Sequence, residues 1–321
     1  MPFDINTTDT EVLSSFGKEA QGKTLLITGP STAGIGSKVA VSLATAGPKL
    51  LILAGRNKSK ITPVIGGINR ANPGVQVKFV QLDLLSQKSV HDAVTQVKEA
   101  TDHIDILINN AGVMAPRKFL LSQDGVESQF AANYLSHFLL TNLLLKSGLI
   151  RAGDLILNIG SLGYQMSDIQ YDNINYSNGE SYNGWKAYGQ AKSAQLLGTR
   201  GLANRLKGKG IAVLVAHPGV TLESSLLANS AIDQEYFGEA YLLAIERNDG
   251  QPLPPQNMVS IEQAAGVVLY TALNPELRSK PAAFIVENGI YALTKDYAIN
   301  DADADKLWEL SESLVGERFE F

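Results

Sequence analysis

The chain holds a pair of residues whose types and spacing suit acid–base chemistry on a helix. In Tyr188-Gly-Gln-Ala-Lys192 a phenol and an ammonium stand four residues apart, which would place both side chains on one helix face. A nearby positive charge lowers the pKa of a phenol, so that the phenol exchanges protons nearer neutrality. The same spacing occurs in two further pairs, Tyr182/Lys186 and Tyr291/Lys295.

Sequence context selects Tyr188 from these three tyrosines. Tyr182 is followed at once by an Asn-Gly pair, and both of those residues are poor helix formers. Tyr291 comes after another Asn-Gly pair, beyond the last expected strand. Tyr188 alone lies in a sustained apolar helical pattern between two core strands. We therefore expect Tyr188 and Lys192 to be catalytic.

A glycine-rich turn follows the first strand-like run, in Gly29-Pro-Ser-Thr-Ala-Gly34-Ile-Gly36. Glycine is needed where backbone turns tightly and approaches a pyrophosphate, and a helix N-terminus then offers free N–H groups to the anionic oxygens. We expect Gly29, Ile35 and Gly36 to bind a dinucleotide. The alternative is an ordinary loop that contains glycines.

Arg56 follows the second strand-like run and predicts the type of dinucleotide. Proteins that bind NAD usually place an acidic residue near this point, whereas the 2′-phosphate of NADP requires a cation. Residues 50–60 contain no acid. A charge-assisted contact from Arg56 would contribute about 1.5–3 kcal/mol, which favours NADP. The alternative is a solvated surface arginine.

The ends of the next two strands supply further cofactor candidates. Asp83 could accept a hydrogen bond from an adenine amino group, or it could cap the helix that begins near Ser86. Asn110 and Gly112 follow the fourth strand, where small residues let a cofactor lie against the strand ends at the switch point of a sheet.

Two polar residues could act on the substrate. Ser161 follows the fifth strand, and its hydroxyl could stabilise a carbonyl oxygen, although a lone serine here is more often part of a turn. Asn133 lies among apolar residues of a helix, where a buried amide is either structural or part of a proton path. His217, in His217-Pro-Gly, is expected to be structural.

Composition excludes several classes of function. Lys and Arg number 27 against 32 Asp and Glu, and a net charge of −5 argues against a nucleic-acid binder. Without cysteine, the chain has no disulfide, zinc-thiolate site or thiol catalyst, and its four scattered histidines predict no metal site. The first 19 residues are polar, and no apolar run reaches the ~18 residues of a membrane helix. We therefore expect a cytoplasmic protein with no membrane anchor.

Strand-like runs alternate with helical stretches along the chain, which predicts an α/β fold with a doubly wound parallel sheet, the Rossmann fold. The expected strands are residues 24–28, 50–54, 77–82, 104–109, 154–159, 211–216 and 282–286. The expected helices are 36–46, 86–100, 125–146, 185–206 and 261–273. Residues 1–22 would form an N-terminal extension and 23–321 a single catalytic domain, with long substrate loops near 163–184 and 222–258.

Taken together, these motifs resemble the short-chain dehydrogenase/reductase family. They stand in family order and cover nearly the whole chain from Lys23: the glycine turn, Asn109-Asn-Ala-Gly, Asn133, Ser161, Tyr188-x-x-x-Lys192 and Pro218-Gly219. The sequences around Asn133 and Tyr188 look like the branch of the retinol dehydrogenases and the WW-domain oxidoreductases. One departure is an extra residue in the glycine turn, which has four residues between Gly29 and Gly34 where the family usually has three.

The resemblance implies roles for individual residues. Tyr188 would exchange a proton with the substrate, while Lys192 lowers the pKa of Tyr188 and holds the nicotinamide ribose. Ser161 would orient the carbonyl oxygen and Asn133 would support a water path to Lys192. Val220 and Thr221 would meet the nicotinamide amide.

These implications define the expected function. The protein would be an NADP(H)-dependent oxidoreductase of the carbonyl reductase or alcohol dehydrogenase type, with NADP as cofactor and a small, fairly apolar carbonyl or alcohol as substrate. Residues Leu222, Leu226, Leu227, Tyr236, Phe237 and Tyr241 suggest the apolar substrate. A non-catalytic NADP-binding sensor or scaffold and a double-bond reductase are the alternatives. A homo-oligomer is also possible.

Overall fold

The computed structural model describes residues 3–228, 232–251 and 258–321. Its centre is an eight-stranded sheet in the order β3-β2-β1-β4-β5-β6-β7-β8. The seven strands from β1 to β7 run parallel, and β8 pairs antiparallel with β7. The strands are β1 (Thr24–Thr28), β2 (Leu50–Gly55), β3 (Gln76–Gln81), β4 (Ile106–Asn109), β5 (Leu155–Ile159), β6 (Ala212–His217), β7 (Phe284–Val286) and β8 (Gly289–Ile290).

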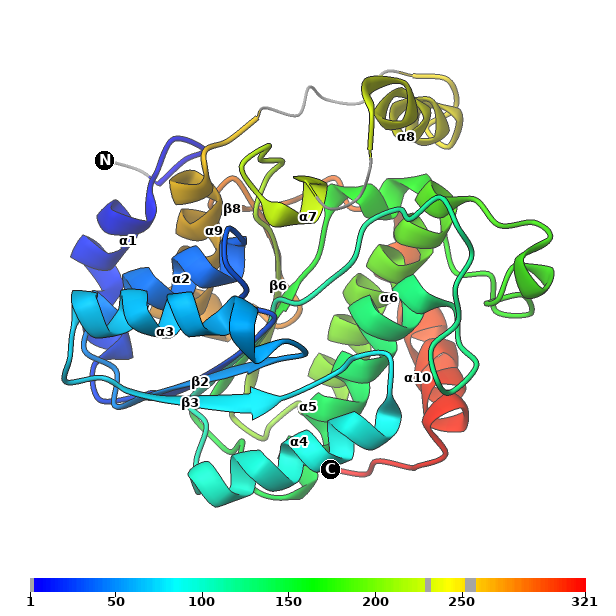
Figure 1. Cartoon of the computed structure of the whole chain (residues 1–321). Helices are drawn as coiled ribbons and strands as arrows, with labels where there is room; N and C mark the ends of the chain where they lie inside the picture. Colours follow the sequence, from blue (N-terminus) through cyan, green and yellow to red (C-terminus); the bar gives the residue numbers. More distant parts are fainter. Residues whose placement is uncertain (1–2, 229–231, 252–257) are drawn as a thin grey trace.

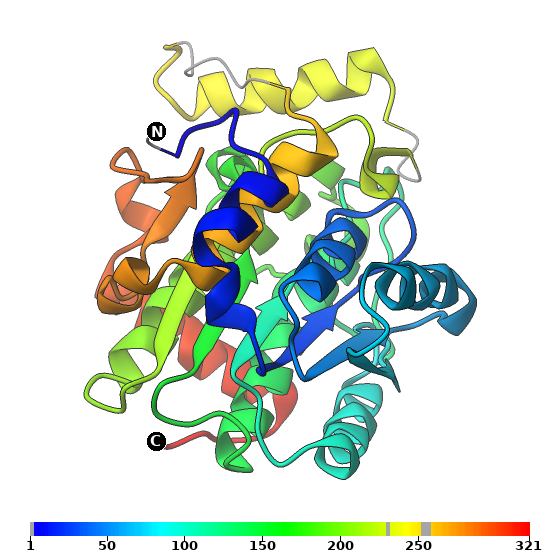
Figure 2. The same cartoon turned by 90° about the vertical axis from the view of Figure 1, so that its left-hand side faces the viewer.

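Helices cover both faces of the sheet (Figures 1 and 2). One core layer joins the sheet to α1 (Asp9–Phe16), α2 (Ile35–Thr45), α3 (Lys58–Ala71) and α9 (Ile261–Leu273). The other joins it to α4 (Gln87–Ala100), α5 (Ser136–Lys146), α6 (Gly184–Arg205) and α10 (Asp301–Val315). Successive strand residues alternate between the layers, so that Leu25 and Ile27 pack on one side and Leu26 on the other. The expected doubly wound fold is confirmed.

The strand order reverses between β1 and β4, which makes that point the switch point of the sheet. The carboxyl ends of β1 and β4 therefore lie where open α/β sheets bind ligands. Most of the residues expected in the site follow the carboxyl end of a strand, so the topology brings their segments to one edge.

Several helices depart from the expected pattern. α1, α3, α10 and α8 (Gln234–Glu246) were not expected, and α8 and the short α7 (Ser225–Ala228) lie within the expected substrate loop 222–258. Residues 229–231 and 252–257 of that loop lie outside the described residues. The expected helix 125–146 opens instead with a π-helical turn, Phe130–Leu135, and continues as α5.

The first segment of the chain packs into the core. α1 lies against α9, which Figure 2 shows at the front of the molecule, and Val12 and Ala20 are fully buried. Lys38 of α2 joins this contact by ion pairs to Asp9 (3.3 Å) and Glu262 (3.1 Å).

Candidate active site

Helix α6 carries Tyr188 and Lys192, and its first turn explains why this tyrosine differs from Tyr182. The side chain of Asn183 caps the helix, because its Oδ1 accepts hydrogen bonds from the N–H groups of Trp185 and Lys186, both at 3.0 Å. Tyr182 therefore lies before the helix, where its hydroxyl donates to the carbonyl oxygen of Pro116 (3.0 Å).

The third pair is not helical either. Tyr291 follows β8, and Lys295 donates from Nζ to Asn248 Oδ1 (2.6 Å). Of the three pairs, Tyr188 and Lys192 alone share a helix, as context predicted.

The Lys192 ammonium is buried beside the Tyr188 ring. Its Nζ lies 5.5 Å from the ring centroid and donates to the carbonyl oxygen of Ile159 (2.9 Å) and to Gln195 Oε1 (2.7 Å). Burial lowers the pKa of Lys192 to about 7. Gln195 was not singled out from the sequence, although its position three residues after Lys192 places it on the same helix face.

The effect of Lys192 on the pKa of Tyr188 stays a prediction. Burial raises the pKa of Tyr188 to about 12, and the contribution that lowers the pKa comes from the Ser161 hydroxyl. Lys192 gives its hydrogen bonds to Ile159 and Gln195 rather than to the phenol. In this state Tyr188 is a protonated group at neutral pH, suited to donate a proton.

Ser161 both shapes a turn and faces Tyr188. It caps a short 3₁₀ helix, Leu162–Met166, and its Oγ accepts from the N–H of Gly163 (3.0 Å). A Cβ atom at Gly163 would lie 2.7 Å from Tyr188 Cε1 and 3.1 Å from Ser161 Oγ. The absence of a side chain at position 163 therefore lets the phenol and the serine approach each other.

Asn133 lies in the π-helical turn and is fully buried. Its Oδ1 accepts from the N–H of Val113 (2.8 Å), and its Nδ2 donates to the carbonyl oxygen of Val113 (2.9 Å). The Asn133 amide thus holds the chain just after Gly112. A Cβ atom at Gly112 would lie 3.1 Å from Asn133 Oδ1 and would disturb this contact. The water path to Lys192 remains a prediction.

A buried histidine links this turn to β1. His137 Nε2 lies 2.9 Å from Thr28 Oγ1, which already accepts from the N–H groups of Asn110 (2.9 Å) and Ala111 (3.0 Å). The Thr28 hydroxyl must then donate to Nε2, so that His137 Nδ1–H donates to the carbonyl oxygen of Asn133 (3.1 Å). Burial lowers the pKa of His137 to about 4, which keeps the ring neutral.

The glycine turn packs tightly against the end of β4. A Cβ at Gly29, whose φ is +64°, would lie 2.6 Å from Ala111 Cβ, and a Cβ at Gly36 would collide with the Asn110 amide. Asn110 Nδ2 donates to the carbonyl oxygen of Thr28 (2.8 Å). Gly34 precedes α2, which begins at Ile35. The glycine turn after β1 and the turn after β4 therefore meet at the switch point, beside the N-terminus of α2.

The extra residue of the turn is accommodated by left-handed backbone. Ala33 has φ +60°, an uncommon value for a residue with a side chain. Thr32 ties the turn to α3, because its N–H (3.0 Å) and its hydroxyl (2.8 Å) both donate to the carbonyl oxygen of Lys60. The insertion therefore contacts the helix that follows Arg56.

The two residues expected at the adenosine end differ in their surroundings. The Arg56 side chain is exposed beyond β2. Asp83 Oδ1 accepts from the N–H of Leu85 (3.0 Å), and the capping residue of α4 is Ser86. Asp83 thus holds the turn that leads to the helix cap.

The end of β6 lies next to Lys192. His217 is buried, its Nδ1 has no hydrogen-bond partner among the described residues, and burial together with the Lys192 charge lowers its pKa to about 4. Gly219 turns the chain with φ +90°, and Thr221 is buried. Val220 pairs with Met258 and accepts from the N–H of Val259 (2.9 Å).

Helix α8 covers the start of α6 through an aromatic contact. Trp185 Nε1 donates to the carbonyl oxygen of Tyr236 (2.6 Å), the rings of these two residues lie 5.2 Å apart, and Trp185 meets Tyr188 edge-on at 6.2 Å. Arg117 stacks over the Tyr236 ring at 4.1 Å and pairs with Asp233 (2.7 Å). Figures 1 and 2 show α8 at one end of the molecule.

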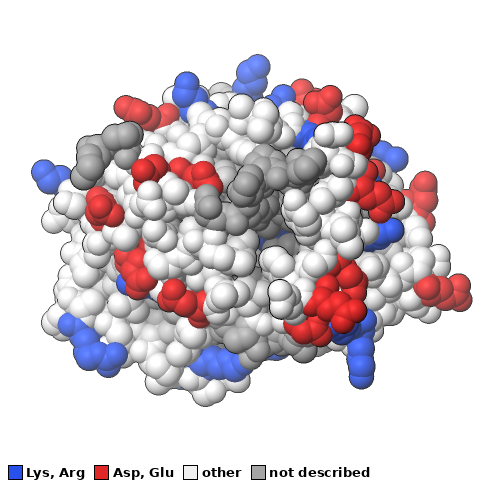
Figure 3. All heavy atoms as spheres, turned by 90° about the horizontal axis from the view of Figure 1, so that it is seen from above, with Lys and Arg blue, Asp and Glu red and all other residues white. Residues whose placement is uncertain are grey.

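The face that carries α8 exposes several large apolar side chains. Seen from above, Asp, Glu, Lys and Arg stand mainly around the rim (Figure 3). Large apolar side chains are exposed on α8 and nearby segments: Leu222, Phe237, Tyr241, Leu242 and Met258.

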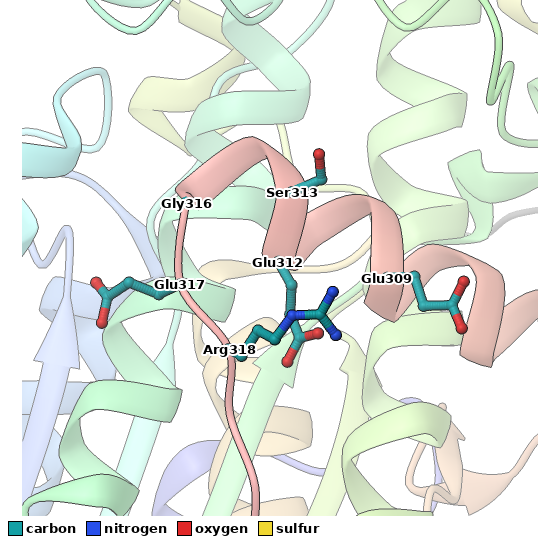
Figure 4. A pocket seen from close by; sticks show the side chains of 6 residues that line it. All are labelled: Glu309, Glu312, Ser313, Gly316, Glu317 and Arg318. Atoms are coloured by element: carbon teal, nitrogen blue, oxygen red, sulfur yellow. The ribbon is translucent and has the colours of Figure 1, made fainter.

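Two other features share no residue with the set around Tyr188. A hollow of 540 Å³ lies at the end of α10, but its lining side chains, from Glu309 to Arg318, point in different directions (Figure 4). His103, Asp105 and Asp154 form a cluster with metal-ligating groups, in which His103 Nε2 lies 2.9 Å from Asp154 and Lys23 pairs with Asp105 (3.6 Å).

In the part of the chain that the structure describes, no helix is long and apolar enough to span a membrane.

Comparison with known proteins shows the family to which the chain belongs. The sequence profile described as "short chain dehydrogenase" matches residues 23–235. Human retinol dehydrogenase 13 is 40% identical over 296 residues, which cover 92% of this chain and 85% of the relative. The WW domain-containing oxidoreductase of Drosophila melanogaster is 33% identical over 324 residues, 99% of this chain and 74% of the relative.

A solved structure shares the fold. It is a short chain dehydrogenase from Burkholderia cenocepacia in complex with NADP, with a TM-score of 0.63 and 24% identity over 84% of this chain and 98% of that chain. The chain belongs to the short-chain dehydrogenase/reductase family. Its relatives place it in the branch of the retinol dehydrogenases and the WW domain-containing oxidoreductase.

Proposed function

We propose that this protein is an NADP(H)-dependent oxidoreductase that interconverts a carbonyl compound and an alcohol. The observation that carries the proposal is the meeting of Tyr188, Ser161 and Lys192 beside the carboxyl ends of the strands. A buried phenol, a hydroxyl that faces it and a buried ammonium form a set that can transfer a proton to an oxygen atom.

The residues at the switch point fit a dinucleotide. The first N–H groups of α2 have no partners within the helix and suit an anionic pyrophosphate. Gly29, Ile35 and Gly36 would hold that group, and Asn110 and Gly112 would border the cofactor where the β4 turn meets the glycine turn.

The ends of the cofactor would meet two further groups of residues. Arg56 is exposed where the 2′-phosphate is expected, and Asp83 would meet the adenine. Val220 and Thr221 would meet the nicotinamide amide. NADP in the Burkholderia relative supports the choice of this cofactor.

The side chains of the site would divide the chemistry as follows. The nicotinamide cofactor, when bound, exchanges a hydride with the carbonyl carbon. Ser161 donates a hydrogen bond to the carbonyl oxygen, and Tyr188 gives that oxygen a proton. A phenol whose pKa is about 12 is protonated at neutral pH, which suits reduction. The Lys192 charge stabilises the phenolate that remains.

The apolar side chains of α8 and of the residues packed around Tyr188 support an apolar substrate. Trp185, Tyr236 and Met166 form an apolar cluster with Tyr188, and Phe237 and Tyr241 extend apolar surface along α8. We therefore propose a small, fairly apolar ketone, aldehyde or alcohol. The cytoplasmic location and the homo-oligomer remain predictions.

The proposal is tested by NADPH oxidation against a panel of ketones and aldehydes, followed by absorbance. Tyr188→Phe keeps the ring and removes the proton, so kcat is expected to fall by ~10²-fold or more. Tyr182→Phe is the matched control, because its hydroxyl bonds to Pro116 outside α6, and it should keep most of the activity. NADPH binding without turnover of any compound would contradict the proposal and favour a sensor.

A further inference from the structure

Gln195 is the side chain that holds Lys192. Its Oε1 accepts from Lys192 Nζ at 2.7 Å, and the second acceptor is the backbone carbonyl oxygen of Ile159 at 2.9 Å. Any residue at position 159 would supply that carbonyl, whereas an acceptor at position 195 depends on the side chain. Gln195 is 3% exposed, so water does not readily replace the amide.

The surroundings of Lys192 leave the Gln195 amide without a charged competitor. Tyr188 from α6, His137 from α5 and His217 from β6 face the ammonium. The phenol is protonated at neutral pH and both histidines, with pKa values of about 4, are neutral. Among the described residues, no carboxylate pairs with Lys192. The position and the charge of Nζ therefore depend on neutral acceptors.

A small polar cavity borders Gln195. Its volume is 30 Å³, and polar side chains of β5, α5 and α6 line it together with Phe138 and Trp308. Asn142 is one of these residues, and its buried Oδ1 has no hydrogen-bond partner in the described part of the chain. A polar cavity needs about 10–15 Å³ to hold a water molecule, so this one is large enough.

We propose that Gln195 is the positioning residue for Lys192, and that the cavity beside it binds a buried water molecule held by Asn142 and the Gln195 amide. The positioning role rests on the proposed function, whereas the hold on Lys192 and the water site do not. With Gln195 in place, Nζ stays between β5 and α6, close enough to Tyr188 for its charge to stabilise a phenolate.

The hold on Lys192 is tested directly by ¹⁵N NMR of the lysine Nζ groups during a pH titration of the protein without substrate. An ordinary lysine titrates near 10.4, so a resonance that titrates near neutrality and is lost in Lys192→Met belongs to Lys192. Gln195→Leu removes an acceptor that favours the ammonium, and the pKa is expected to fall by roughly one unit. Gln195→Glu adds a negative charge, and the pKa is expected to rise by at least about one unit.

Gln190→Leu is the matched control for the loss of a buried amide on the same helix. Gln190 is fully buried, but it bonds to the backbone of Gln170 and Ile174 rather than to Lys192. The control is expected to leave the Lys192 titration unchanged even if its Tm falls. Shifts in the same direction for Gln195→Leu and Gln195→Glu, or no shift in either, would overturn the assignment.

The positioning role is tested by kcat as a function of pH. In the reduction direction kcat should fall as the pH rises and Lys192 loses its charge. This fall in kcat is expected at lower pH in Gln195→Leu and at higher pH in Gln195→Glu. A fall in kcat that stays at the same pH while the NMR titration moves would overturn the positioning role. If no compound is turned over by any variant, the proposed function fails, and the NMR titration still decides whether Gln195 holds Lys192.

The water site is tested by a high-resolution crystal structure of the wild-type protein. Density for a water molecule within hydrogen-bond distance of Asn142 Oδ1 is expected, and Asn142→Leu should displace it. A cavity that is dry in the wild-type structure would overturn this part of the inference.

Discussion

Gly163→Ala is the sharpest test of the geometry around Tyr188, because it adds one methyl group and removes no functional atom. The new Cβ would lie 2.7 Å from Tyr188 Cε1, about 0.7 Å short of ordinary van der Waals contact, so either the phenol or the turn after β5 must move. A displacement approaching 1 Å in a reacting group costs up to ~10²-fold in rate. We expect kcat to fall by roughly 10- to 100-fold.

The assay is NADPH oxidation with the best substrate of the panel, with NADPH affinity measured in parallel. Affinity should stay within about twofold, because Gly163 follows β5 and the glycine turn follows β1. Gly17→Ala is the matched control, since its nearest neighbour would be an ordinary 3.6 Å away. An unchanged kcat in a folded Gly163→Ala protein would refute the arrangement of Tyr188, Gly163 and Ser161.

Three further predictions concern the serine, the cofactor and the cover. Ser161→Ala should lower kcat by ~10²–10³-fold, which is the usual loss when a hydrogen-bond donor to a developing oxyanion is removed, with little change in NADPH affinity. An equal loss of NADPH binding would show that Ser161 only stabilises the turn. Arg56→Ala should raise the KM for NADPH by ~10-fold or more and leave the KM for NADH nearly unchanged, and a wild-type enzyme that prefers NADH would sink the argument. Arg117→Ala should loosen α8, raising the KM for substrate several-fold and altering Trp185 fluorescence in a Trp308→Phe background that leaves Trp185 as the remaining tryptophan. Lys118→Ala, an exposed neighbour, is its control, and equal spectra for the two variants would count against the contact.

The sequence predicted the strands well because most of them are apolar on both faces, as in a parallel sheet covered on both sides. Helix α3 was missed because Pro63 and two glycines interrupt it, although Ile61, Val64 and Ile68 keep a helical spacing and are buried. Helix α8 was missed because its apolar side chains are partly exposed and give no clear buried face.

In the site, contacts between residues close in the sequence could be predicted, whereas contacts between distant residues could not. The Tyr188/Lys192 pair and the Asn183 cap depend on neighbours within one turn, and such contacts can be derived from spacing. The clamp of Asn133 on Val113 joins residues twenty positions apart. The pKa of Tyr188 depends on burial by the whole fold, which no local pattern reports.

The attachment of α8 has a consequence for protein engineering. Trp185 Nε1 donates a hydrogen bond to the main-chain carbonyl oxygen of Tyr236 in α8. This hydrogen bond does not require particular side chains in the rest of α8. Tyr241 and Leu242 are exposed and belong to a different element from Tyr188 and Lys192, whereas the Phe237 ring meets Trp185 edge-on at 6.0 Å. On the proposed function, a library randomised at Tyr241 and Leu242 should therefore change the preference among carbonyl substrates while Tyr188 and Lys192 are retained.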